Sequence, residues 1–233
     1  MHAALSFNLL YGRSCMGVKM SKVKITDEFW KAEQELVRTE VIPYQWDALN
    51  DNVKDAAPSY CMRNFRIAGE VNKKRKEAGY KEIKYPIPRD KWEFLPGNSE
   101  NDTFHGFVFQ DTDVYKWLEA VGYSLMNHPD PELEATADRA IDIIESAQLD
   151  NGYLDTLYAI NDKDLIFTDL RDKHELYCFG HLCEGAIAYY RATGKRKILD
   201  VTIRFADFIY SWFVEGGIKG YPGHEIAEMA LAK

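Results

Sequence analysis

Residues 174–185, HELYCFGHLCEG, bring two histidines, two cysteines and two glutamates into one short stretch. His174, Cys178 and His181 are spaced by four and three residues, which places them on one face of a helix. Such a set could bind zinc. The HExxH pattern of zinc peptidases is absent, because Cys178 stands where its second histidine would be. One helix rarely supplies three ligands, so zinc binding here is the minor interpretation.

The same stretch could instead bind the hydroxyl groups of a sugar. His174 and His181 can each donate and accept hydrogen bonds, as hydroxyl groups require. Glu175 adds an acceptor, and Tyr177 adds a ring with one apolar and one polar end. The alternative is a buried polar helix whose histidines bond to the backbone or to each other. Spacing alone favours neither reading.

A second candidate stretch is FQDTDVYKW, residues 109–117, at the start of a predicted helix. Capping and the helix dipole account for Asp111 at this position. Asp113 and Trp117 lie four residues apart, share a face and are predicted to reach a cavity.

Two further stretches have a simple structural explanation beside a functional one. QLDNGYLDT, residues 148–156, is predicted to be a turn, because Asn-Gly tolerates positive φ; the alternative is that Asp150 and Asn151 contact a ligand. GYPGHEIAE, residues 220–228, places His224 and Glu225 at a helix start. Capping is the simpler account of these two residues, and a site at the mouth of a barrel is the alternative.

Helical periodicity dominates the elements that must position these groups. We expect Pro43 to end the first helix, and we expect connections over residues 79–110 and 155–172. Two antiparallel hairpins follow from the short turns between neighbouring helices. The predicted helices span residues 28–42, 58–78, 112–127, 131–148, 174–193 and 196–214, with another from 224.

The helices of the second hairpin differ in kind. Between His174 and Tyr190 only Glu175 and Glu184 carry full charges, which indicates a helix covered on both sides or lining a cavity. Its partner, residues 196–214, is amphipathic. A pair of inner and outer helices is the unit of an α/α toroid. We therefore predict an all-α fold, an incomplete (α/α)6 barrel made of antiparallel helical hairpins.

Composition and charge argue against two classes of protein, nucleic-acid-binding and membrane-spanning proteins, and indicate a cellular compartment. The 233 residues carry a net charge of −8 without a basic run, which argues against nucleic-acid binding. No apolar run approaches the roughly 20 residues of a membrane span. The four cysteines show no disulfide spacing, so we expect a cytoplasmic protein.

The two ends of the chain suggest where the domain lies. Residues 1–20 are predicted to be a start-site extension or a disordered N-terminus, because MSKVKITDEFW reads as a natural start at Met20. Residues 21–233 are expected to form the N-terminal part of a barrel domain. The closing HEIAEMALAK lacks a helix stop signal, so we expect the domain to be truncated there.

The quoted stretches together resemble glycoside hydrolase family 127, whose type member is a retaining β-L-arabinofuranosidase. The resemblance runs from about Val23 to Lys233. It implies an (α/α)6 barrel and release of L-arabinofuranose or a related sugar from plant-type glycans in carbohydrate metabolism. The matching segments are DEFWKAEQELVRTEVIPYQWDAL, FQDTDVYKWLEA, AQLDNGYLDT, HELYCFGHLCEGAIAYYRATGKRKILDVTIRFAD and GYPGHEIAEMALAK.

The resemblance also implies a cysteine nucleophile bound to zinc and a glutamate acid/base, all beyond the matched stretch. We therefore expect no catalytic residue, no zinc and no activity in this chain alone. The partners expected are a small-molecule or oligosaccharide substrate, no nucleic acid, no membrane, and a second copy in a full-length homodimer. The alternatives are a non-catalytic sugar-binding fragment and, less favoured, a zinc protein using His174, Cys178 and His181.

Substrate-binding residues come from two sources. His174 carries over from the family as its sugar-contacting histidine, and its neighbours Lys173 and Asp172 are weaker candidates. Asp113, Trp117 and His181 are inferred from the direction in which they are expected to face.

Overall fold

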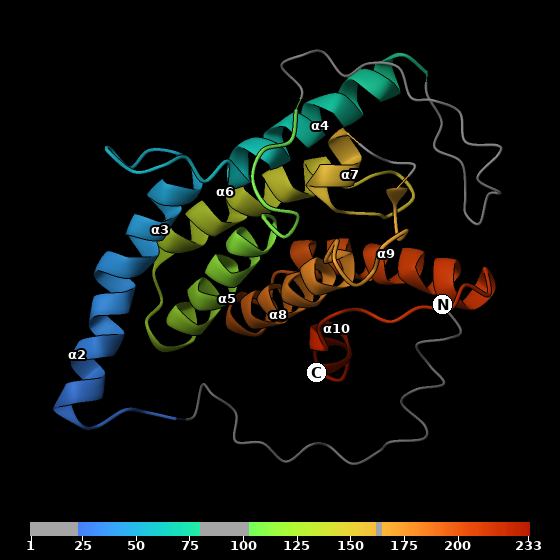
Figure 1. The fold of residues 1–233 in the computed structure, drawn as a ribbon. Coiled ribbons are helices and arrows are strands. Elements are labelled where there is room, and N and C mark those ends of the chain that lie inside the picture. The colour runs from blue at the N-terminus through green and yellow to red at the C-terminus, as the bar shows by residue number, and fades with distance from the viewer. Residues whose placement is uncertain (1–22, 80–102, 162–164) are drawn as a thin grey trace.

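The computed structural model describes residues 23–79, 103–161 and 165–233, so residues 1–20 lie outside the described part. Within these three ranges every regular element is a helix, which confirms the all-α prediction (Figure 1). None of these helices is long and apolar enough to cross a membrane.

The N-terminal helices run together past the proline that was expected to stop them. α2 (Glu28–Leu36) starts at Asp27, whose carboxylate accepts a hydrogen bond from the Trp30 amide. A π-helical turn, η2 (Val37–Val41), then leads into α3 (Ile42–Leu49). The prediction that Pro43 ends the helix is wrong. Pro43 lies in the first turn of α3, where a missing N–H is tolerated.

The remaining helices form two packed rows. In the inner row α5 packs against α3 and α8, and α8 packs against α10; in the outer row α6 packs against α4 and α9. The inner helices α3, α5 and α8 each lead along the chain to an outer helix, as in an incomplete α/α barrel (Figure 1). The bounds are α4 Cys61–Glu77, α5 Thr112–Asn127, α6 Pro131–Ala147, α8 Glu175–Thr193, α9 Lys197–Tyr210 and α10 Ile226–Leu231, with a π-helical turn η5 (Ser211–Glu215) after α9.

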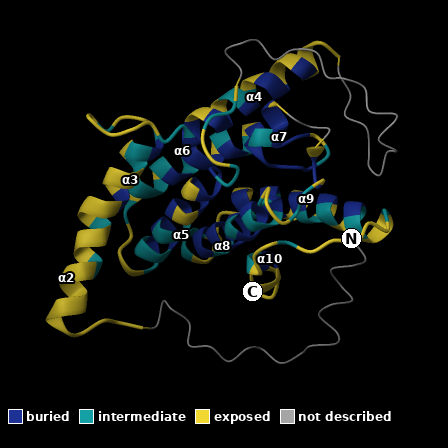
Figure 2. Ribbon diagram, in the orientation of Figure 1, coloured by how far each residue is buried: buried dark blue, intermediate teal, exposed yellow. Residues whose placement is uncertain are grey.

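α8 is covered on both sides, as its weakly charged sequence predicts, and Figure 2 shows it largely buried. Glycines allow the inner helices to approach closely. A Cβ atom at Gly185 would lie 2.6 Å from the Tyr115 carbonyl oxygen on α5. A Cβ atom at Gly180 would lie 2.8 Å from the Ala227 nitrogen on α10. α8 is therefore the middle of the inner row and packs closely against both neighbours.

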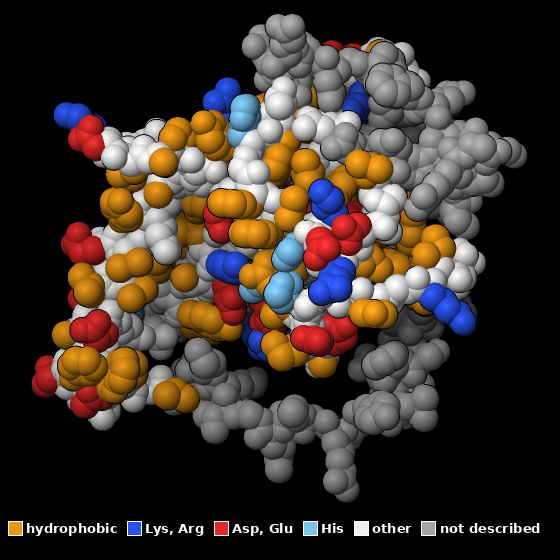
Figure 3. Space-filling view, viewed as in Figure 1, with side chains coloured by type: hydrophobic (Ala, Val, Ile, Leu, Met, Phe, Trp, Pro, Cys, Tyr) orange, Lys and Arg blue, Asp and Glu red, His pale blue; other side chains and the backbone are white. Residues whose placement is uncertain are grey.

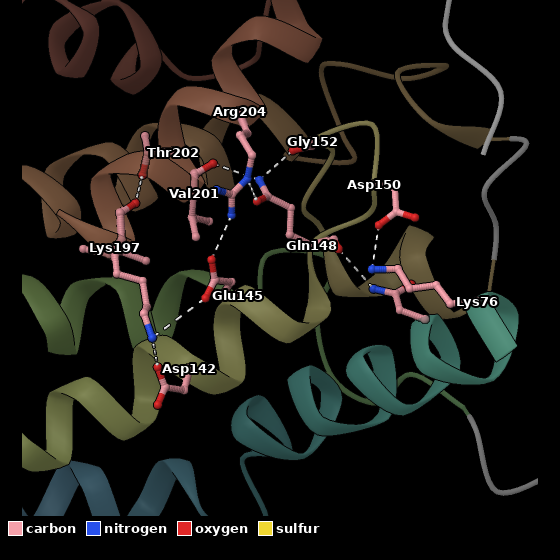
Figure 4. Close-up of polar contacts among 12 residues, drawn as sticks. Lys76, Asp142, Glu145, Gln148, Asp150, Gly152, Lys197, Val201, Thr202 and Arg204 are labelled. Carbon is pink, nitrogen blue, oxygen red and sulfur yellow. Dashed lines mark hydrogen bonds and ion pairs between the residues drawn. The ribbon is translucent and has the colours of Figure 1, made fainter. Parts of the chain in front are cut away.

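The turn that directly follows α6 is held by the Gln148 side chain (Figure 4). Its Nε2 donates to the carbonyl oxygens of Gly152 and Val201, each at 2.8 Å. Its Oε1 accepts from Arg204 Nε at 2.7 Å, and Arg204 also pairs with Glu145. The amide thus joins the turn to α9, and two further ion pairs in the same view are Lys197–Asp142 and Lys76–Asp150.

The connection predicted for residues 155–172 contains a short helix, α7 (Thr156–Ile160). Asp155 caps it by accepting a hydrogen bond from the Leu157 amide at 3.1 Å. Periodicity could not reveal a helix of five residues, because it spans little more than one turn. α7 packs against α4, and most of its residues are buried.

Candidate functional site

His174 precedes the first residue of α8 and has a left-handed backbone, with φ 61° and ψ 16°. This conformation is uncommon for a residue with a side chain, and such strain gathers at functional sites. Its ring Nδ1 lies 2.8 Å from the Asp172 carbonyl oxygen. A carbonyl only accepts, so Nδ1 carries the hydrogen and, in the neutral ring, Nε2 is an acceptor.

The Nε2 atoms of His174 and His224 lie 3.2 Å apart. Since the neutral His174 ring offers an acceptor at this atom, His224 must donate from its own Nε2. His224 comes from the segment just before α10, so the pair joins two neighbouring parts of the inner row. A sugar hydroxyl, which donates and accepts at once, could bond to both rings.

Aromatic rings surround this pair. The Tyr177 ring centroid lies 5.1 Å from that of His224 and 4.5 Å from that of His181, and the Tyr177 and His181 rings are nearly perpendicular at 83°. We call His174, Tyr177, His181 and His224 the histidine cluster. Figure 3 shows histidine side chains together on one face, with hydrophobic side chains and charges of both signs beside them.

The start of α5 supplies a cation and a carboxylate beside the cluster. Lys116 Nζ donates to Tyr177 Oη at 3.0 Å and lies 5.1 Å from the centre of the Tyr177 ring. Asp113 is exposed, and its carboxylate accepts from Gln110 Nε2 at 2.7 Å. Partial shielding of the carboxyl raises the pKa of Asp113, and Lys116 opposes that shift. Lys116 therefore places a cation on Tyr177 of the histidine cluster, and its charge also acts on the Asp113 carboxylate.

His181 lies deeper on the same helix face and is half-buried. Burial lowers its pKa to about 4, and the charge of Lys116 lowers it further. Its Nδ1 is buried and has no hydrogen-bond partner among the described residues. The ring is therefore neutral near pH 7, and one polar atom is left for a ligand or a water molecule.

Glu175, the residue after His174, anchors the start of α8 through its buried side chain. Its carboxyl is fully buried, accepts from Tyr153 Oη at 2.6 Å, and contacts the Phe167 amide through both oxygens at 2.9 and 3.0 Å. Burial raises the pKa of Glu175 to about 8. The residue type and position of Glu175 suggested an acceptor for a sugar hydroxyl. The structure uses it to tie two loops to the start of α8, directly after His174.

Asp111 occupies the N-cap position of α5, as predicted, but its side chain makes no capping hydrogen bond there. Its buried carboxylate accepts from the Thr156 amide at 2.8 Å and from the Thr156 hydroxyl at 2.5 Å. Burial raises the pKa of Asp111 to about 6. The contact joins α5 to α7, a pairing over 45 residues of sequence that local capping rules cannot anticipate.

Trp117 is not brought to the histidine cluster. Its side chain is 2% exposed, its indole Nε1 donates to the Ile42 carbonyl at 3.0 Å, and its ring stacks on Trp46 at 4.6 Å. Asp113 on the same helix is exposed, so the two residues do not share one environment. The indole instead joins α5 to α3, because burial of a large ring against a neighbouring helix is strongly favoured.

Asp172 and Lys173 are both exposed. Asp172 takes part through its backbone, since its carbonyl orients the His174 ring. Its carboxylate lies 3.9 Å from Arg171. The Lys173 amide donates to the Asp169 carbonyl, and no contact brings the Lys173 side chain to the described residues of the cluster.

His224 lies in the histidine cluster, although helix capping was the simpler expectation for it. The helix α10 begins at Ile226 without any side-chain capping bond. Phe109, whose ring centroid lies 5.4 Å from that of His174, was not singled out at all. A histidine placed in the Pro-Gly turn before an inner helix was the available signal for His224. Phe109 carried no comparable signal.

The described residues do not fit a zinc ion. Cys61, Cys178 and Cys183 are all buried, and burial raises the pKa of each thiol, which opposes the thiolate that zinc requires. Cys178 is buried and lies against Asp155, so its thiol does not form a ligand set with His174 and His181. No group of three or more His, Cys, Asp or Glu side chains in the described ranges is placed to hold a metal.

Comparison with known proteins gives a consistent result. The family of β-L-arabinofuranosidase, GH127 catalytic domain, matches residues 22–233. A non-reducing end β-L-arabinofuranosidase from Bifidobacterium longum subsp. longum is 39% identical over 232 residues, which cover 91% of this chain and 30% of that protein.

Two solved structures extend the comparison to the fold. Ara127N-Se, a GH127 β-L-arabinofuranosidase from Geobacillus stearothermophilus T6, is 46% identical with a TM-score of 0.74, over 91% of this chain and 29% of that one. The GH127 β-arabinofuranosidase BT3674 is 32% identical with a TM-score of 0.70, over 92% of this chain and 30% of that one. The chain thus spans less than a third of each relative's length. It belongs to the GH127 β-L-arabinofuranosidase catalytic-domain family.

Proposed function

We propose that this chain forms the sugar-binding wall of a retaining β-L-arabinofuranosidase-like glycosidase. The substrate class is a glycan or small glycoside that ends in L-arabinofuranose or a related sugar of plant type. His174 and His224 bind the sugar hydroxyl groups, with His181 and Asp113 at the margins. Family membership supports the substrate class, and the arrangement of the histidine cluster supports the binding role.

The observation that carries this proposal is the contact between the two Nε2 atoms at 3.2 Å. The Asp172 carbonyl fixes the hydrogen of His174 on Nδ1, so Nε2 of His174 accepts the hydrogen bond that Nε2 of His224 donates. A sugar that displaces this contact would meet one acceptor and one donor side by side. Adjacent hydroxyl groups of a sugar need this combination. The neighbouring rings of Tyr177 and Phe109 supply apolar surface for the carbon face of the sugar.

Bond cleavage, in this proposal, requires groups that the chain does not contribute. The chain spans 29–30% of the lengths of its solved relatives. Among the described residues the cysteine thiols are buried and their pKa values are raised, which is opposite to what a nucleophilic thiolate needs. The chain alone should therefore bind an L-arabinofuranoside without hydrolysing it. Turnover of an aryl β-L-arabinofuranoside by this chain would contradict that part of the proposal.

Binding is tested by calorimetric titration of the chain with methyl β-L-arabinofuranoside. His174→Ala should weaken binding about three- to tenfold, the loss expected when one or two uncharged hydrogen bonds are removed. His128→Ala is the matched control. His128 is an exposed histidine that follows the last residue of α5 and is not part of the cluster.

The control should bind as tightly as the unmodified chain. Equal affinities of the His174→Ala and His128→Ala variants would rule out the proposed role of His174. Circular dichroism of both variants checks that the helices are retained.

A further inference from the structure

Phe107 is the most exposed phenylalanine among the described residues, with 68% of its surface accessible. Its ring lies parallel to that of Phe109, with centroids 5.4 Å apart and an interplanar angle of 2°. Phe109 therefore covers one face of the Phe107 ring, and most of the remaining ring surface is open. An exposed apolar surface beside a candidate binding site is a place where a ligand can bind.

The turn that presents Phe107 is well anchored. The Phe107 amide donates to Gln110 Oε1 at 3.3 Å, and the Gln110 amide donates back to the Phe107 carbonyl at 2.9 Å. Gly106 has φ 106°, and a Cβ atom there would meet Gln110 Oε1 at 2.5 Å. One residue earlier, the fully buried Asn64 holds both backbone groups of His105 at 2.8 and 3.1 Å. The exposed ring is therefore held in position by its surroundings.

The two rings are continuous with the candidate sugar site. Phe109 contacts the His174 ring at a centroid distance of 5.4 Å, with a tilt of 55°. Phe109 thus contacts the histidine on one side and Phe107 on the other. Figure 3 shows hydrophobic side chains directly beside the exposed histidines on this face. A ligand whose first ring lies on the histidine cluster would extend its next ring over this aromatic surface.

We propose that Phe107 and Phe109 form a stacking platform for the second sugar of the substrate, the one to which the terminal L-arabinofuranose is attached. This inference rests on the proposed function. The carbon face of a sugar packs on an aromatic ring, whereas its hydroxyl groups stay in water at the rim. Because the platform offers the free face of Phe107, backed by Phe109, and no charged group of its own, it would favour ligands that carry a second sugar ring.

The test compares two ligands on the intact chain. One is methyl β-L-arabinofuranoside, and the other is a disaccharide in which the same sugar is attached to a second L-arabinofuranose. The disaccharide should bind about three- to tenfold more tightly to the unmodified chain, as expected for one aromatic stacking contact. Phe107→Ala should abolish this preference and leave the affinity for the methyl glycoside unchanged.

Two further variants control the comparison. Phe29→Ala removes a phenylalanine of similar exposure, 65%, from α2, and it should leave the disaccharide preference unchanged. Phe107→Tyr keeps the ring face and should keep the preference, which separates stacking from a general disturbance of the turn.

The outcomes separate the two proposals. The platform is overturned if the unmodified chain shows no disaccharide preference, or if the preference persists in Phe107→Ala. Failure of the unmodified chain to bind either ligand would overturn the proposed function, and the platform with it.

Discussion

The close contact between α5 and α8 leads to a sharp prediction about Gly122. A Cβ atom added at this position would lie 2.6 Å from the Ala188 carbonyl carbon and 2.8 Å from the Tyr189 nitrogen. Both are backbone atoms of α8, so they cannot rotate away from the new methyl group. Gly122→Ala should therefore push the two inner helices apart.

The expected loss of stability follows from two opposing effects. Overpacking of a close-packed interior costs about 1–3 kcal/mol, whereas replacing glycine by alanine within a helix gains about 1 kcal/mol. The backbone contact places Gly122→Ala toward the upper end of the first range, so the net loss should be about 1–2 kcal/mol. Such a loss lowers the melting temperature by roughly 2–8 °C in a domain of this size.

Gly69→Ala on α4 is the matched control. Its added Cβ would meet Ser146 Oγ at 2.5 Å, but this hydroxyl group can rotate away. Gly69→Ala should therefore leave the free energy of unfolding unchanged or raise it by up to about 1 kcal/mol. Urea unfolding followed by tryptophan fluorescence gives the midpoints and slopes of all three proteins. A Gly122→Ala variant as stable as Gly69→Ala, with an unchanged slope, would refute the close approach of α5 and α8.

Two predictions concern titration. The pKa of Glu175 rises from 4.5 to about 8 on folding, so the unfolded chain loses this proton first and the contribution to stability falls as pH rises from about 4.5 to 8. Glu175→Gln removes this dependence. In urea unfolding, the free energy of unfolding of the variant should be lower than that of the unmodified chain at pH 5, and the variant should gain more than about 1 kcal/mol relative to the unmodified chain by pH 8. A difference that does not change with pH would contradict the assignment. His181, whose pKa is lowered to about 4, should keep a neutral ring signal at pH 5.5 in proton NMR, whereas a midpoint near 6.5 would show that its burial is wrong.

Local sequence patterns predict much of this fold. Pro131 in the first turn of α6 and Gly194 after α8, with φ 74°, lie where the rules for helix ends place them. The weakly charged face of α8 identified an inner helix before any packing was known. Pro43 was misread because a stop signal and a first-turn proline look identical until the π-helical turn before it is seen.

The candidate site was less accessible to sequence reasoning, because it depends on contacts between distant segments. Facing direction along one helix placed Trp117 beside Asp113, but packing against α3 buried the indole. Asp111 lies at the N-cap position of α5 as predicted, but its carboxylate bonds to Thr156 and not to the amides of α5. The pairing of His174 with His224 bridges 50 residues, and no local rule connects them.

The most direct test of the central claim is NMR of the imidazole nitrogens during titration with methyl β-L-arabinofuranoside. The binding proposal predicts that the Nε2 signals of His174 and His224 shift together and saturate, while the signal of His128 stays unchanged. Saturable shifts absent from both cluster histidines would contradict it.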